Sequence, residues 1–319
     1  MGALNKVTLK NSQTGYESFD DAALYPLPGG DVLVQSVDFF TPIVDDPFIF
    51  GQIAAVNALS DIYAMGADPL FALNIAGFPK DELPLSVLTE ILNGGSSITE
   101  KIGIPILGGH TIKDKELKYG LVVSGIGKKE SLVRNNTARP GDLLVLTKPL
   151  GTGIITTAIK RDLADNHLID SVTELMIGLN KSAAEAMTEV GVNACTDVTG
   201  FGLLGHLLEM CAGSDVSAVI DFDKCPFLEG VFELAQKGVV PGGTKSNLTH
   251  VIPSANFSDK ILPFQQLMLS DAQTSGGLLL SVPAARAELL VTRLREKQTL
   301  AAAVIGQVYN AAEFRIYIK

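Results

Sequence analysis

Apolar positions along the first half of the chain alternate between short strand-like runs and longer helix-like stretches. Apolar, β-branched runs predict strands at 31–37, 70–75, 104–107, 119–126 and 143–147. Longer stretches with helical spacing predict helices at 48–65 and 85–101. This alternation is typical of an α/β or α+β protein.

The second half of the chain also contains both helix-like and strand-like stretches. Helices are expected at 154–163, 172–190, 202–211, 227–237 and 284–297, and strands at 216–222, 277–282, 301–308 and 313–318. The polar segment 240–244 is expected to be an exposed turn. Lys148-Pro149-Leu150-Gly151 interrupts the pattern, so we expect two domains, 1–148 and 149–319.

Composition indicates a globular protein with a large core. Hydrophobic residues make up 46% of the 319 positions and charged residues 19%. No run of eighteen apolar residues predicts a membrane span, and the N-terminus lacks the pattern of a signal peptide. The three cysteines form no Cys-x-x-Cys pair and are expected to be buried thiols of a cytoplasmic protein.

The net charge of −10 comes without any block of Lys and Arg, which argues against nucleic acid as a partner. An acidic protein that binds a polyanion needs another source of positive charge, and a divalent metal ion can supply it. The P-loop signature G-x-x-x-x-G-K-[ST] is missing, and Gly151-x-Gly153 is not followed by a third glycine at the dinucleotide spacing. Gly200-Phe201-Gly202-Leu203-Leu204-Gly205 opens an expected helix, whose N-terminus favours anions, but an isolated glycine turn of this kind is a weak signal. If the chain binds a nucleotide, it holds the phosphates with residues other than a P-loop.

Aspartates beside turns and helix starts are the most informative feature. They are Asp20, Asp21, Asp38, Asp61 and Asp197, and Asn57 shares a helix face with Asp61. Gathered in a cleft, such carboxylates would repel each other and call for a cation, and hard oxygen ligands select Mg²⁺ or Mn²⁺. Each can also be structural, as a cap or as the partner of a buried Lys or Arg.

Glycine turns form a second class of candidates. Gly108-Gly109-His110-Thr111 follows a short apolar run, and its backbone N–H groups could approach a phosphate closely. Tight chain reversal explains such turns equally well. His206 lies among leucines in an expected helix, so we interpret it as a core histidine.

These segments resemble the selenophosphate synthetases (selenide, water dikinases), within the group related to aminoimidazole ribonucleotide synthetase. The similarity runs from about Asp20 to the C-terminus. The segments that carry it are Asp20–Ala23, Val37–Asp45, Ala55–Gly66, Gly108–Thr111, Thr196–Leu207, Val240–Thr244 and Gln273–Leu279.

The resemblance implies a two-domain α/β fold, a homodimer that pairs strands of the N-terminal halves, and Mg²⁺ with ATP as substrate. It implies a reaction of ATP, selenide and water that gives selenophosphate, AMP and orthophosphate. By position, it implies metal-binding roles for Asp21, Asp38, Asp61 and Asp197, and an ATP site lined by Ser18, Phe19, Asp20, Asp38, Gly109, His110 and Thr111.

One departure concerns the family's glycine-rich N-terminal segment, which holds a reactive Cys or Sec followed by a Lys. No cysteine precedes Cys195, and Lys6 and Lys10 do not sit in such a motif. The catalytic residue is therefore unassigned, and we expect impaired selenide handling by the chain as given. Two alternatives stay open: a related ATP-dependent enzyme with another substrate, and a non-catalytic nucleotide-binding homologue.

Overall fold

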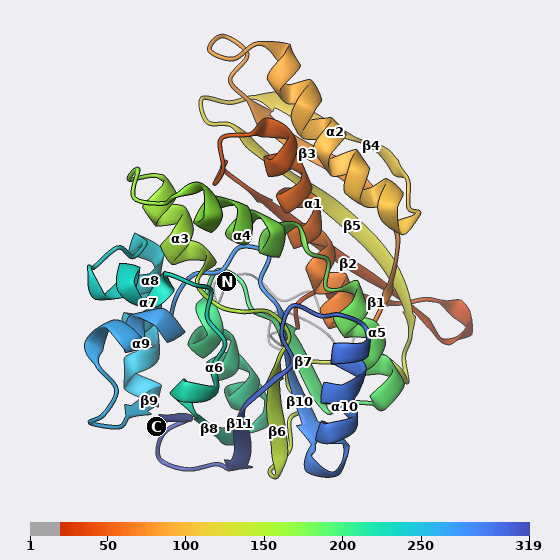
Figure 1. Ribbon diagram of the computed structural model, residues 1–319. Helices are drawn as coiled ribbons and strands as arrows, with labels where there is room; N and C mark the ends of the chain where they lie inside the picture. Colours follow the sequence, from red (N-terminus) through yellow and green to blue (C-terminus); the bar gives the residue numbers. More distant parts are fainter. Residues whose placement is uncertain (1–19) are drawn as a thin grey trace.

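The computed structural model describes residues 20–319, which form two β-sheets with helices packed around them (Figure 1). The first sheet has five strands, in the order β1 (Ala23–Pro26), β2 (Asp31–Phe40), β5 (Lys118–Lys128), β3 (Asp68–Phe78) and β4 (Ile106–Lys113). All neighbours are antiparallel except β3 and β4, which run parallel. Helices α1 (Pro47–Ala64) and α2 (Leu85–Ile102) pack on one face of this sheet.

The second sheet has seven strands, in the order β7 (Ala194–Asp197), β10 (Leu278–Pro283), β6 (Asp142–Leu146), β11 (Ala303–Asn310), β8 (Val216–Ile220), β12 (Ile316–Ile318) and β9 (Ala255–Phe257). The remaining helices are α3 (Thr152–Ile159), α4 (Asn166–Ile177), α5 (Lys181–Val190), α6 (Gly202–Ser214), α7 (Val231–Gln236), α8 (Gly242–Val251), α9 (Pro263–Leu269) and α10 (Ala284–Glu296). The pattern matches the expected α/β class.

Helix α1 lies between the two halves of the molecule. Asp46 caps its N-terminus, because the Asp46 side chain accepts a hydrogen bond of 2.9 Å from the backbone N–H of Ile49. Most of its residues are buried, because it packs against β2 and β5 on one side and against β7, α4 and α5 on the other. A helix enclosed in this way should be apolar all round. Polar side chains within it are therefore the exceptions that need an explanation.

Several predicted elements change in detail. The helix expected at 172–190 is two helices, α4 and α5, because the chain breaks at Gly178–Asn180. The helix expected at 154–163 ends at Ile159, and Asp162 has a positive φ of 55°. The exposed turn expected at 240–244 is wrong: Val240 and Thr244 are buried, and α8 begins at Gly242.

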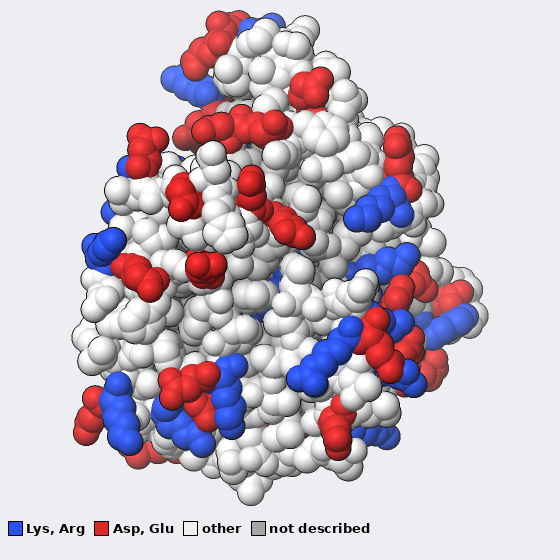
Figure 2. Space-filling view, viewed as in Figure 1, with Lys and Arg blue, Asp and Glu red and all other residues white. Residues whose placement is uncertain are grey.

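The domain limits 1–148 and 149–319 stay a prediction. Strand β6 pairs with β10 and β11, so residues 142–146 belong to the second sheet although they precede the expected boundary. Among residues 20–319, no helix is long and apolar enough to cross a membrane. On the face of the described residues drawn in Figure 2, acidic and basic side chains are mixed, without a continuous basic patch.

Candidate functional site

Two polar side chains of α1 face the first sheet, where β2 presents polar residues of its own. The Asn57 side-chain amide donates a hydrogen bond of 2.6 Å to the carboxylate of Asp38, and the Ser36 hydroxyl donates to the carboxylate of Asp61. Ser36 and Asp38 are two residues apart on β2 and therefore point to the same side of the sheet. Asp38 lies within β2, which continues to Phe40, and does not end the strand as the sequence suggested.

Asp197 and Asp21 approach the same region from the second sheet and from the segment before β1. Asp197 is the last residue of β7 and is 2% exposed. Asp21 accepts a hydrogen bond of 2.7 Å from the hydroxyl of Thr196, the neighbour of Asp197. The structure thus brings together Asp21, Asp38, Asp61 and Asp197, which are far apart in the sequence.

The charges of these carboxylates act on one another. Burial raises the pKa of Asp21 and of Asp61 well above the usual value, and the neighbouring charge of Asp197 raises both further. Burial also raises the pKa of Asp38. The pKa of Asp197 rises to about 6, first through burial, while a hydrogen bond from Ser60 opposes the rise. Without a cation, the cluster therefore favours holding protons.

Two oxygen atoms of this cluster lack a hydrogen-bond partner among residues 20–319. They are Oδ2 of Asp21 and Oδ2 of Asp197, and both are buried. Leaving a buried acceptor unpaired costs about 1–3 kcal/mol, more for a charged one, so an oxygen-seeking cation fits here. As they stand, no group of three or more His, Cys, Asp or Glu side chains among residues 20–319 is spaced to hold a metal ion. The four aspartates therefore offer the oxygen ligands that such an ion prefers, but their side chains are not arranged as a complete coordination shell.

Lys148 provides the nearest buried positive charge. Its side chain is buried, and its Nζ donates hydrogen bonds of 2.6 Å to the carbonyls of Gly178 and Ser275 and of 3.3 Å to that of Leu175. Burial lowers the pKa of Lys148 to about 7, and the charge of Asp197 opposes this shift. Lys148 forms no ion pair with any described residue. It therefore does not neutralise the cluster in the way a salt bridge would.

The loop before β10 is connected to the cluster by hydrogen bonds. The backbone N–H of Ser275 donates 2.8 Å to Oδ1 of Asn57, and Asn180 donates to the Ser60 hydroxyl at 2.9 Å and to the Gly276 carbonyl at 2.8 Å. Asn57 thereby orients Asp38 while it is itself held by the loop. These contacts fix α1 relative to the second sheet at the point where the aspartates meet.

Asp20 has a different role from the other acidic residues. Its carboxylate is 3% exposed and accepts a 2.9 Å hydrogen bond from Nε of Arg134 and a second one, of 2.5 Å, from the guanidinium NH2 group. This ion pair is the structural alternative left open for such residues. Ser18 and Phe19, expected beside it in an ATP site, lie outside the described residues.

The Gly109–Thr111 segment lies away from the aspartates within one chain. It belongs to β4, the edge strand, and β5 and β3 separate it from β2. His110 of β4 is paired with Ile75 of β3. Leu73, two residues before Ile75, is paired with Val122 of β5, and Val122 is paired with Val37 of β2. Because residues two apart share a face, His110 and Val37 lie on the face opposite to α1.

Residues that position the aspartates were missed by the sequence reasoning. They are Ser36, Ser60, Thr196, Asn180 and Lys148. Lys148 offered a signal, because a charged residue directly after the apolar run 143–147 is unusual for a buried strand end. His206 is buried, as interpreted, and burial lowers its pKa to about 4, but its Nδ1 has no hydrogen-bond partner among the described residues.

Comparison with known proteins identifies both halves of the chain. Residues 19–128 match the family model described as AIR synthase related protein, N-terminal domain, and residues 139–319 match the corresponding C-terminal domain. Among solved structures, thiamine-monophosphate kinase from Stenotrophomonas maltophilia has a TM-score of 0.71 at 18% identity and covers 94% of this chain and 89% of its own. A hydrogenase maturation protein HypE in complex with ATP has a TM-score of 0.67 at 21% identity, over 93% of this chain and 82% of its own. These likenesses establish the fold.

Curated relatives are much closer in sequence. The selenide, water dikinase of Myxococcus xanthus is 51% identical over 97% of this chain and 88% of its own length. The protein of the same name from Carboxydothermus hydrogenoformans is 48% identical over 94% of this chain and 87% of its own. The chain therefore belongs to the AIR synthase related proteins and, within them, to the selenide, water dikinase family.

Proposed function

We propose that the protein catalyses the ATP-dependent synthesis of selenophosphate from selenide and water, with AMP and orthophosphate as the other products. The relatives named selenide, water dikinase support the reaction. The observation that carries the proposal for this chain is the convergence of Asp21, Asp38, Asp61 and Asp197, whose cluster contains buried oxygens without a partner among the described residues. No described residue is proposed as the group that handles selenide.

The four aspartates would hold Mg²⁺, and the metal would supply positive charge against the phosphates of ATP. This chain's own residues prepare the site. Ser36 and Thr196 donate to the carboxylates of Asp61 and Asp21, and Asn57 orients Asp38. Gly109, His110 and Thr111 would line the nucleotide.

The first test is calorimetric titration of Mg-ATP into Asp61→Asn and Asp197→Asn variants. Each substitution removes one negative charge and keeps the size of the side chain. We expect affinity to fall by tenfold or more, which corresponds to about 1.4 kcal/mol or more. Asp215→Asn is the control, since Asp215 is exposed and pairs with Arg315 at the far end of α6. Unchanged affinity in both variants, with normal melting curves, would refute the site.

We further propose that the protein is a homodimer formed through the face of the first sheet that no helix of residues 20–319 covers. α1 and α2 cover one face, whereas the other presents apolar side chains to solvent, with Val37 54% and Phe39 49% exposed. An exposed apolar surface of this kind marks an interface. His110 lies on the same face, so pairing of two copies offers a way to bring the Gly109–Thr111 segment to the other copy's aspartates.

A cytoplasmic location is the remaining part of the proposal. Cys195, Cys211 and Cys225 are all free and buried, as thiols in a reducing compartment are. Cell fractionation tests it directly.

A further inference from the structure

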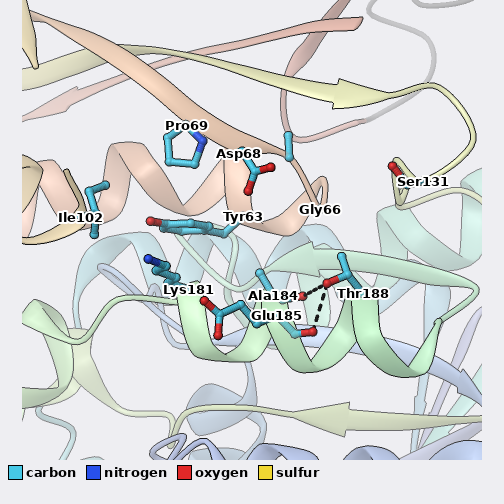
Figure 3. Close-up of a pocket in the computed structure, with 11 residues that line it drawn as sticks. Tyr63, Gly66, Asp68, Pro69, Ile102, Ser131, Lys181, Ala184, Glu185 and Thr188 are labelled. Atoms are coloured by element: carbon cyan, nitrogen blue, oxygen red, sulfur yellow. Dashed lines mark hydrogen bonds between the residues drawn. The ribbon is translucent and has the colours of Figure 1, made fainter. Parts of the chain in front are cut away.

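Two adjoining cavities lie on the side of α1 that faces α5, apart from the aspartates. Cavity A, about 360 Å³, is bordered by the end of α1, the start of β3 and α5 (Figure 3). Cavity B, about 320 Å³, is bordered by the end of α2, the first turn of α5 and the segment 298–300. Ile102 and Lys181 line both cavities, so the two meet at these residues. Neither cavity is lined by Asp21, Asp38, Asp61 or Asp197, although Lys148 and Asn180, which belong to the site described above, line cavity B.

Cavity B is basic although the protein is acidic. Of the described residues, its lining includes Lys101, Lys148 and Lys181 and no Asp or Glu. The lining also includes Ser182 and Ala183, in the first turn of the ten-residue helix α5, where backbone N–H groups lack helical partners. No described residue forms an ion pair with Lys101 or Lys181. Lys148 adds charge only, because its Nζ already donates to three carbonyls.

Cavity A contributes a buried donor that also lacks a partner. Tyr63 is 4% exposed, and its hydroxyl has no hydrogen-bond partner among the described residues. In Figure 3 this hydroxyl points along the cavity toward the end where Ile102 and the Lys181 amine lie. The carboxylates of Asp68 and Glu185 line the same cavity and can accept hydrogen bonds. Burial, and after it the charge of Glu185, raises the pKa of Tyr63 above its ordinary value, so the hydroxyl stays a donor.

We propose that the joined cavities bind a small phosphomonoester. Its phosphate would lie in cavity B, where an anion meets lysines, the N-terminus of α5 and no carboxylate. Its hydroxyl-bearing organic part would extend into cavity A. There it meets one free donor, Tyr63, and two acceptors, Asp68 and Glu185, which match a polyhydroxylated group. This site goes beyond the proposed reaction and does not depend on it.

The cavity wall is directly connected to the aspartates. Asn180 lines cavity B and donates to the Ser60 hydroxyl, which in turn is hydrogen-bonded to Asp197. A ligand in cavity B would therefore lie two hydrogen bonds from the proposed metal site without entering it. Experiments on the cavity can exclude the aspartates by leaving out magnesium and nucleotide.

The test is calorimetric titration of the whole protein in EDTA, without nucleotide, using sn-glycerol 3-phosphate, inorganic phosphate and glycerol as probes. We expect both phosphates to bind, glycerol 3-phosphate more tightly, and glycerol not at all. Lys101→Gln/Lys181→Gln should weaken both phosphates by roughly tenfold or more, because charge-assisted hydrogen bonds are lost. Lys237→Gln, which removes the same charge from an exposed position after α7, should bind like the wild type.

The Tyr63→Phe variant tests the contribution of cavity A separately from that of cavity B. It keeps the ring and deletes a hydroxyl that has no partner in the described part of the chain, so the fold should persist in a melting curve. We expect phosphate affinity to stay unchanged and the preference for glycerol 3-phosphate over phosphate to disappear. The proposal is overturned if neither phosphate binds the wild type, if the double lysine variant binds both as well as Lys237→Gln does, or if Tyr63→Phe keeps the preference. Because magnesium is absent, these outcomes are independent of the Asp61 and Asp197 titrations.

Discussion

At the residue scale, the notable feature is the concentration of carboxylates in a buried place with few hydrogen bonds. Two unit charges about 4 Å apart repel by about 1 kcal/mol in water and by roughly 4 kcal/mol at an effective dielectric near 20. Burial raises the pKa of Asp21, Asp61 and Asp197. The charge of Asp197 raises the pKa of Asp21 and of Asp61 further, and the charge of Asp38 raises that of Asp61 and of Asp197. Such an arrangement destabilises the metal-free fold, and function explains its presence better than stability does.

The pH dependence of stability follows from Asp197. Its folded pKa of about 6 lies above its ordinary value of 3.8, so the native state binds more protons between these values. The free energy of unfolding therefore falls as pH rises from about 4 to 6, and the penalty persists above pH 6. In EDTA, Asp197→Asn should melt at a higher temperature than the wild type at pH 7.5, and the difference should vanish near pH 4.

Thermal melts across this pH range check the prediction, and Asp215→Asn serves as the exposed control. A lower melting temperature for Asp197→Asn at pH 7.5 without metal would show that this carboxylate stabilises the fold instead. Adding magnesium should raise the melting temperature of the wild type more than that of the variant, because a ligand that binds the native state stabilises it.

At the element scale, the close crossing of α1 and α2 sets the position of the α1 side chains. A Cβ on Gly51 would lie 2.0 Å from the Ile91 carbonyl oxygen, and one on Gly94 would lie 2.0 Å from that of Phe48. The two helices therefore touch backbone to backbone through reciprocal glycines. This contact holds α1 in the place from which Asn57 and Asp61 reach β2.

Gly51→Ala should break this contact. Because the obstacle is backbone, the helices must move apart, and we expect a loss of about 3 kcal/mol of unfolding free energy. Gly243→Ala is the matched control: Gly243 lies exposed in α8, and a Cβ there meets only Ala272 at 3.9 Å. Helix propensity predicts a gain of up to about 1 kcal/mol for this variant. Chemical denaturation measures both, and equal effects would contradict the role of the crossing.

At the scale of the whole molecule, the helices of residues 20–319 cover only one face of the first sheet. Val37 and Phe39 lie exposed on this face, and the edge strand β4 is exposed along most of its length. A long exposed edge beside an apolar face is a hazard for a monomer. Pairing of two copies would cover both features, which is why the proposed dimer belongs to the same picture as the proposed nucleotide site.

Phe39→Arg should convert the proposed dimer to a monomer, because a charged side chain in an apolar interface has no partner there. Analytical ultracentrifugation measures the change. Leu289→Arg is the control: Leu289 is likewise 49% exposed but lies on α10, away from the first sheet. A wild-type protein that sediments as a monomer at micromolar concentration would disprove the interface, as would loss of dimer in the control alone.

The sequence predicted much of the secondary structure because its apolar periodicity is strong. The long strands of the first sheet, helices α1 and α2, and the helix and strand that follow Gly277 all appear where the pattern indicated. Where the apolar pattern was weak or short, the elements were not predicted correctly. The α4–α5 break at Gly178–Asn180 was missed because apolar spacing continues across it, and β1, β9 and α9 are too short to show a period.

The sequence by itself determined the chemistry of the candidate site: a set of acidic side chains that can bind a cation, and no P-loop motif. Only the tertiary structure decided how they group. Folding brings Asp21, Asp38, Asp61 and Asp197 together around α1. It pairs Asp20 with Arg134 and places His110 on the face of the sheet opposite to α1. The reason is physical: side-chain chemistry is local to each residue, whereas proximity depends on how two sheets close over one buried helix.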